Sequence, residues 1–302
     1  MFSPMRAALQ KLPISITKYI DDNVSSPVAL IGCRATNPAI SFDCCEYDLV
    51  VIREHRDAYL NKYLKIDDHN VELMNMWNTS KNIIATKGMI IVNGLVAPQL
   101  FSHSIYASAL GAFGKKSIVA SLFCSDKIDL AVSKRPILAS MWLKISAYHF
   151  LEGILSLAGC RPMPLHELNQ IRNLEFEEQY ISDGIQVALT CIGTERSTRS
   201  AINRSSSAIL QLYSENYDKE LVIEKAKHLV KLGMLPDCYY YLGKMASRVL
   251  TNKEPAFFQS YAKLIQISMD LGIDVPLIQK LHLQLFSAAK NVLKNYRRIT
   301  AA

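Results

Sequence analysis

The spacing of apolar residues changes near residue 100, and this change predicts two differently built regions. Before that point, short apolar runs such as Val28–Ile31 and Met89–Val92 are bounded by turn residues, as is typical of β-strands. After it, apolar residues recur at helical spacing almost to the end of the chain. We therefore expect an α+β protein with a small mixed sheet in residues 1–98 and an all-helical region in residues 99–302.

The helical region is expected to begin with a connecting helix at about residues 100–122. Gly159 follows a long apolar helical pattern, which predicts a helix end in the left-handed conformation. Isoleucines at Ile16 and Ile20 suggest one more amphipathic helix near the start of the chain. The charged segment 53–64 and the short segment 80–86 are also expected to be helical. The remaining helices are predicted over residues 137–158, 178–192, 199–214, 219–232, 238–250, 255–271 and 275–296.

The segment 28–52 combines an apolar strand, a turn at Gly32, a polar loop and a second strand over residues 46–52. Because strand side chains alternate between the two faces of a sheet, Glu46 and Asp48 share one face. Two neighbouring carboxylates repel each other unless a cation lies between them. Their hard oxygen atoms suit Mg²⁺ or Mn²⁺, and Mg²⁺ usually bridges to substrate phosphates.

The order of strand, Gly32-Cys33 turn, spacer, Glu46-x-Asp48 and apolar strand resembles the signature of the DNA polymerase beta-like nucleotidyltransferases. The resemblance covers roughly the first third of the chain. Cys33 stands where the family most often has Ser, and Glu46 stands where Asp is commoner. The resemblance implies transfer of a nucleoside monophosphate from a nucleoside triphosphate, such as ATP, to an acceptor hydroxyl. Glu46 and Asp48 would be catalytic ligands of Mg²⁺ or Mn²⁺.

The resemblance also implies a third carboxylate on a neighbouring strand, either as a metal ligand or as the base for the incoming hydroxyl. Glu72, within the strand-like stretch 70–76, matches this position best. The competing acids Asp67 and Asp68 precede that stretch and are typical of a solvated turn. The alternative for Glu72 is a surface glutamate on an edge strand.

For the nucleotide, the resemblance implies that the amides of Gly32 and Cys33 hold the triphosphate at the start of a short helix. Arg34 could reach the phosphates or could pair with the acids. The acceptor stays open among a small molecule, a protein hydroxyl and an RNA end. In this family the helical domain commonly closes over the nucleotide or holds the acceptor.

A catalytically degenerate nucleotidyltransferase-like module that binds nucleotide, RNA or a protein partner is the alternative function. The unusual Cys33 and Glu46 motivate it. The position of Glu72 separates the two hypotheses. If its carboxylate lies within metal-bridging reach of Glu46 and Asp48, the enzyme is favoured; if it points away, the binding module is favoured.

Two further motifs are weaker. Arg161 and His166 form the R-x4-H pattern of the HEPN ribonucleases, but Pro162 and Pro164 prevent a regular helix there, so a turn that positions a helix is favoured. The segment 114–117, Gly-Lys-Lys-Ser, lacks both the upstream glycine and the preceding strand of a phosphate-binding loop.

Composition adds little to the functional argument. The 302 residues suffice for two domains, and a net charge of +7 weakly favours a polyanionic partner. The seven cysteines include no Cys-x-x-Cys pair, which suggests reduced thiols in a cytoplasmic setting. We expect no signal peptide, no membrane span and no membrane partner.

Overall fold

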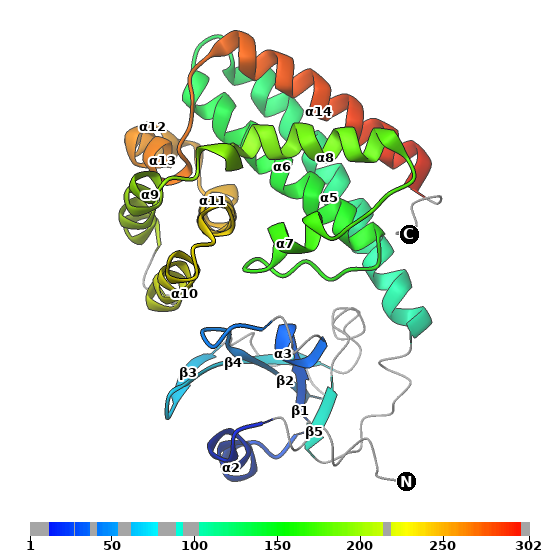
Figure 1. Cartoon of the computed structure of the whole chain (residues 1–302), viewed down its shortest axis with the longest axis vertical. Helices are drawn as coiled ribbons and strands as arrows, with labels where there is room; N and C mark the ends of the chain where they lie inside the picture. The colour runs from blue at the N-terminus through cyan, green and yellow to red at the C-terminus, as the bar shows by residue number, and fades with distance from the viewer. Residues whose placement is uncertain are drawn as a thin grey trace. The chain divides into compact units, whose positions relative to one another are not determined.

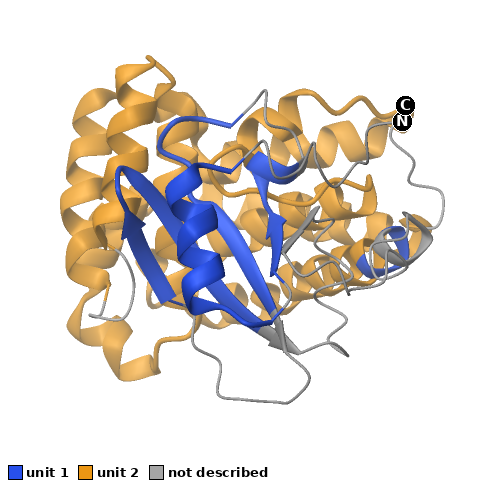
Figure 2. Cartoon of the chain, turned by 90° about the horizontal axis from the view of Figure 1, so that it is seen from below, with its two compact units in different colours: residues 1–109 blue, residues 110–302 orange. Residues whose placement is uncertain are grey.

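The computed structural model describes residues 12–26, 28–36, 41–53, 62–77, 89–92, 103–213 and 219–296. The chain divides into two compact units, Met1–Ala109 and Leu110–Ala302, coloured blue and orange in Figure 2. The division falls inside α5 (His103–Ala131), near the start of the helix that was expected to connect the two regions. The architecture is α+β, as the hydrophobic pattern predicts.

The described part of the first unit contains a mixed five-stranded sheet in the order β3-β4-β2-β1-β5. The central strand β2 runs antiparallel to β1 and parallel to β4 (Figure 1). β1 also pairs antiparallel with β5, and β3 with β4. The strands are β1 Val28–Ile31, β2 Tyr47–Arg53, β3 Lys62–Ile66, β4 His69–Trp77 and β5 Met89–Val92.

One face of this sheet is buried under α2 (Ile14–Asn23), whose Ile16 and Ile20 are fully buried. Alternate strand residues such as Leu49 and Val71 join them in one hydrophobic core. The complete core cluster is Leu12, Ile16, Ile20, Val28, Leu30, Tyr47, Leu49, Val51 and Val71. The residues between these strand positions therefore point to the opposite face of the sheet.

The second unit is helical, and α6 is its central helix. α6 packs against α8, α11, α13 and α14 and buries most of its own length. Gly159 has a φ of +79° just after α6 ends, which confirms the predicted left-handed helix end. The helices after α5 are α6 Pro136–Leu157, α7 Glu167–Arg172, α8 Gln179–Ile192, α9 Arg199–Leu212, α10 Lys219–Lys231, α11 Leu235–Thr251, α12 Pro255–Ser260, α13 Ala262–Met269 and α14 Val275–Asn295.

Two sequence predictions about individual elements are wrong. Residues 53–64 were expected to be helical, yet β3 begins at Lys62 and forms a hairpin with β4. Leu64 packs against the core and Asp67 takes a left-handed φ of +49°, which permits the tight turn. The single helix expected over 255–271 is divided at Tyr261, whose φ of −118° is not helical.

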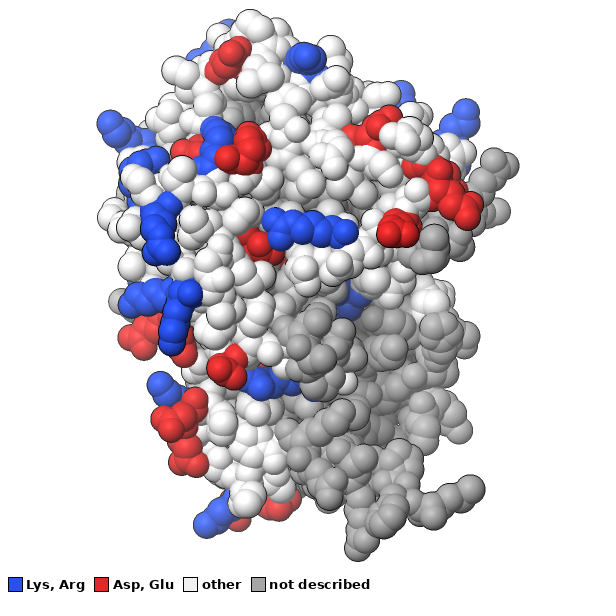
Figure 3. All heavy atoms as spheres, in the orientation of Figure 1, with Lys and Arg blue, Asp and Glu red and all other residues white. Residues whose placement is uncertain are grey.

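Some expectations lie outside the described residues, among them the short helix over 80–86 and most of the segment 54–61. Within the described part of the chain, no helix is both long and apolar enough to cross a membrane. Lysines and arginines are interspersed with acidic residues over the described part of the face seen in Figure 3.

Candidate metal centre

Three carboxylates meet on the sheet face opposite α2. Asp48 on β2 and Glu72 on β4 are register partners in the parallel pair, and Glu46 immediately precedes β2. One oxygen from each carboxylate lies within 4.8 Å of the other two. All three side chains are half-buried. The structure thus brings together the three acids that the sequence singles out.

The local sequence explains why Asp48 and Glu72 share this face. Their neighbours Leu49 and Val71 are buried in the core under α2. Because strand side chains alternate, burial of those neighbours directs the two acids to the other face. The parallel register then places the acids side by side rather than one step apart.

Gly32 follows β1 and borders the site beside Asp48. Ile31 pairs with Asp48, so the chain turns at Gly32 directly beside that carboxylate. Gly32 has a φ of +77°, and a Cβ at this position would overlap the Oδ2 atom of Asp48. Only glycine fits both the backbone conformation and the space.

The Arg34 guanidinium fastens the loop that precedes Glu46. Its Nη2 atom donates to the carbonyl oxygen of Cys45 at 2.7 Å, and Nε donates to the same oxygen at 2.9 Å. Further hydrogen bonds from Nη2 reach the carbonyl oxygens of Phe42 and Asp43 at 3.2 and 3.1 Å. Among the described residues it forms no ion pair, so its observed role is to position the loop from which Glu46 extends.

Tyr47 supports this arrangement from the beginning of β2. Its ring centroid lies 4.3 Å from the Arg34 guanidinium carbon, a cation–π contact. The ring is 8% exposed and belongs to the core under α2. The arginine is therefore held by both the loop carbonyls and the sheet.

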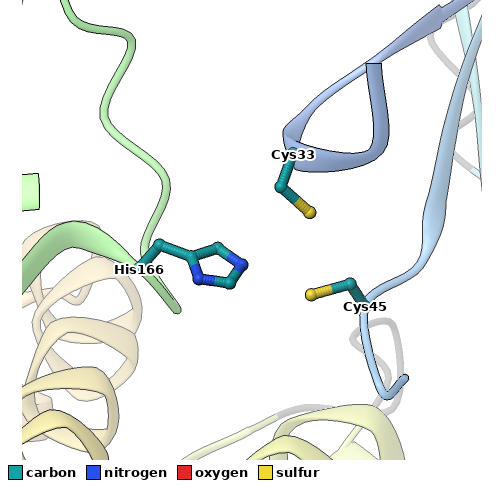
Figure 4. A group of neighbouring side chains, drawn as sticks. All are labelled: Cys33, Cys45 and His166. Atoms are coloured by element: carbon teal, nitrogen blue, oxygen red, sulfur yellow. The ribbon is translucent and has the colours of Figure 1, made fainter. Parts of the chain in front are cut away.

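Cys33 and Cys45 are buried thiols outside any disulfide, and they point toward each other (Figure 4). Cys33 opens α3 (Cys33–Thr36), and Cys45 precedes Glu46. A hydrogen bond to Cys45 and burial raise the pKa of the Cys33 thiol far above its ordinary value, and the Asp48 and Glu46 carboxylates add to this. Cys33 is therefore a neutral thiol at neutral pH.

Tyr63 orients Glu72. The two residues are register partners in the β3–β4 hairpin, and the Tyr63 hydroxyl donates to Oε1 of Glu72 at 2.9 Å. Sequence reasoning missed Tyr63 because residues 53–64 were expected to be helical. The period-two spacing of Leu64 and Ile66, which both pack against the core, is the signal that identifies this strand.

The residues present fit a hard divalent cation. Three carboxylate oxygens form the donor set, which is the chemistry that Mg²⁺ and Mn²⁺ prefer. Oxygens that share one Mg²⁺, each about 2.1 Å from it, lie at most about 4.2 Å apart. The carboxylates therefore need only small side-chain movements to bind one ion together.

The other candidate residues do not belong to this group of three carboxylates. Asp67 and Asp68 are exposed in the turn between β3 and β4, as expected. Arg161 and His166 belong to the second unit and precede α7 in an irregular turn, where Gln170 donates to the Arg161 carbonyl. The segment 114–117 lies inside α5.

Comparisons with protein-family models, with curated proteins and with solved structures found no match to this chain.

Proposed function

We propose that this protein is a metal-dependent nucleotidyltransferase that moves a nucleoside monophosphate from a nucleoside triphosphate to an acceptor hydroxyl. The observation that carries the proposal is the meeting of three carboxylate oxygens within 4.8 Å of one another beside the Gly32 turn. A mixed sheet with its third carboxylate on the neighbouring strand is also what the resemblance to the DNA polymerase beta-like family implies.

In this proposal Glu46, Asp48 and Glu72 hold Mg²⁺ or Mn²⁺. The bound ion would supply charge neutralisation for the triphosphate and activation of the acceptor hydroxyl. Asp48 is the central ligand because it lies between the Gly32 turn and Glu72. Glu72, oriented by the Tyr63 hydroxyl, is either a further ligand or the group that accepts the proton of the acceptor hydroxyl.

In this proposal the triphosphate would lie against the Gly32-Cys33 turn. The absence of a side chain at Gly32 lets the backbone approach Asp48 closely, and it would allow the same approach to a phosphate bound there. Arg34 contributes by holding the loop before Glu46 rather than through an ion pair with the acids. A small molecule, a protein hydroxyl and an RNA end remain the candidate acceptors.

A binding module without turnover is the second candidate. This candidate is favoured because the Arg34 guanidinium already donates hydrogen bonds to the carbonyl oxygens of the loop. In such a module the carboxylates would still bind a metal–nucleotide complex, but no nucleotidyl group would be transferred.

The test is a transfer assay with each nucleoside triphosphate labelled at the α-phosphate, in the presence of Mg²⁺ or Mn²⁺. Candidate acceptors are the protein itself, small alcohols and RNA. We expect metal-dependent label transfer that disappears in Asp48→Asn and persists in Asp68→Asn, whose acid lies in the exposed turn. Metal-dependent binding without transfer would support the module. Transfer that survives in Asp48→Asn would contradict the proposed site.

A further inference from the structure

The second unit contains a cavity of about 410 Å³ that the proposed nucleotidyl transfer does not use. It lies between the beginning of α6 and the corner formed by α12 and α13, which together provide most of its lining. Its volume falls within the range of small-molecule sites, about 300–1,000 Å³. All of its lining residues belong to this unit.

The body of the cavity is apolar. Phe258, Ala262 and Ile265 line one side, and Ile137 and Leu138 line the other. Such a lining favours a ligand with a hydrocarbon or aromatic body, because contact with it removes apolar surface from water.

The edge of the cavity is cationic. Lys134 and Arg135 are exposed and line it, and neither forms an ion pair with any residue that the structure describes. The described lining residues include no acid to balance these charges. Arg135 is also the N-cap residue of α6, where no side chain caps the helix, so the positive end of the helix dipole adds to the field.

We propose that this cavity binds a small molecule with an apolar body and a single carboxylate head. The body would lie against Phe258 and Ile265, and the carboxylate would lie beside Lys134 and Arg135. A carboxylate forms a planar, bidentate pair with a guanidinium, which gives the orientation its specificity. A fatty acid and an aromatic acid share this chemistry.

Trp142 provides an internal reporter of occupancy. Its ring packs edge-to-face against Phe258, with ring centroids 6.0 Å apart, and Phe258 lines the cavity. A ligand that contacts Phe258 is therefore expected to change the emission of Trp142.

The experiment is calorimetric titration of the full chain with decanoate and with 2-naphthoate, each below its aggregation limit. Decanol, which keeps the chain but not the charge, and acetate, which keeps the charge but not the chain, are the ligand controls. We expect at least one of the two acids to bind saturably at one site and to change Trp142 emission. We expect decanol and acetate to bind at least tenfold more weakly. The acid that binds more tightly shows whether the cavity prefers an aliphatic chain, as in decanoate, or an aromatic ring system, as in 2-naphthoate.

Variants locate the site. The double variant Lys134→Ala and Arg135→Ala should weaken binding of the acid at least tenfold, whereas Lys231→Ala, which removes an exposed cation outside the cavity, should not. Ala262→Phe should fill the cavity and abolish binding, with Ala256→Phe on exposed α12 surface as its matched control.

Absence of saturable binding by both acids would overturn the inference, as would binding unchanged in the charge variant. Equal binding of decanol would overturn the assignment of a carboxylate head. Asp48→Asn should leave binding of the acid unchanged, so this test fails or succeeds independently of the proposed nucleotidyl transfer.

Discussion

Asp48 and Glu72 lie directly across from each other on the parallel strands β2 and β4. Side chains at such paired positions are close neighbours, and like charges placed there destabilise a sheet. The nearby Glu46 adds a third negative group within 4.8 Å. A bound divalent cation would turn this local repulsion into attraction.

Replacement of Gly32 by alanine should damage the site more than replacement of Gly159. Both glycines have a φ near +78°, at +77° and +79°, so each variant carries a similar backbone cost of about 1–2 kcal/mol. Only at Gly32 would the new Cβ overlap Asp48; at Gly159 the new Cβ would meet no atom within 4 Å apart from those of its chain neighbours. We expect Gly32→Ala to lose Mg²⁺ binding and Gly159→Ala to retain it, as measured by calorimetry. Equal Mg²⁺ affinity in the two variants would contradict the close contact.

Loss of the Tyr63 hydroxyl should weaken the metal site without unfolding the sheet. Tyr63→Phe removes the hydrogen bond to Glu72 and keeps the ring, so the stability cost should be about 1 kcal/mol. Residues that orient a ligand typically change metal affinity by roughly tenfold or more. Tyr19→Phe is the matched control, because Tyr19 lies on α2, which covers the opposite face of the sheet. Titration with Mn²⁺ measures the metal affinity of both variants. Identical affinities would show that the Tyr63 hydroxyl does not support the metal site.

Arg34 should act through the loop before Glu46. Arg34→Lys keeps the positive charge but cannot reproduce the hydrogen bonds to the carbonyl oxygens of Phe42, Asp43 and Cys45. We expect faster hydrogen exchange of the amides in residues 41–46 of the variant, in the absence of any nucleotide. Exchange as slow as in the wild type, together with weaker nucleotide binding, would instead indicate direct contact between Arg34 and the phosphates.

A separate prediction concerns a buried charge cluster in the helical unit. Lys244 on α11 lies 3.6 Å from Glu152 on α6 and 3.2 Å from the fully buried Glu167. Burial opposes ionisation of Glu152, but the Lys244 ammonium and the His149 ring, whose Nδ1 atom lies 3.7 Å from Oε2 of Glu152, more than offset it and lower the pKa to about 2. Burial dominates at Glu167 and raises its pKa above the ordinary value.

The lowered pKa of Glu152 makes the stability of this unit depend on pH. A carboxyl group with a lowered folded-state pKa stabilises the fold above its ordinary pKa of 4.5, and this contribution is lost as the pH falls toward 2. Since each pKa unit corresponds to about 1.4 kcal/mol, Glu152→Gln should cost about 3 kcal/mol at pH 7 and little at pH 2. Urea unfolding across this range measures the difference, with Glu177→Gln on the surface as control. A cost independent of pH would contradict the ion pair.

Much of the architecture could be predicted from the sequence because it follows from periodicity. The edges of β1 and β5 were placed correctly, and so was the change from strands to helices. The three acids could be grouped because two share a strand face and the third lies on a later strand. Their register could not be predicted, since one residue of slippage would turn Glu72 to the other face.

Other features depend on contacts between distant parts of the chain. Tyr63 was missed because the polar segment before it obscured a short edge strand. Arg34 acts through hydrogen bonds to backbone carbonyl oxygens. Every residue carries such an acceptor, so no sequence pattern shows which of them an arginine will reach. The cavity at the start of α6 arises from helix packing and has no local motif at all.

The most direct test of the central claim is calorimetric binding of each nucleoside triphosphate, with and without Mg²⁺, to the wild type, Asp48→Asn and Asp68→Asn. The isosteric Asp48→Asn removes a ligand charge and leaves the side-chain volume almost unchanged. The account predicts Mg²⁺-dependent binding by the wild type and Asp68→Asn, with affinity reduced at least a hundredfold in Asp48→Asn while its unfolding temperature stays near that of the wild type. Nucleotide binding that is indifferent to both Mg²⁺ and Asp48, or no binding at all, would contradict a metal centre formed by Glu46, Asp48 and Glu72.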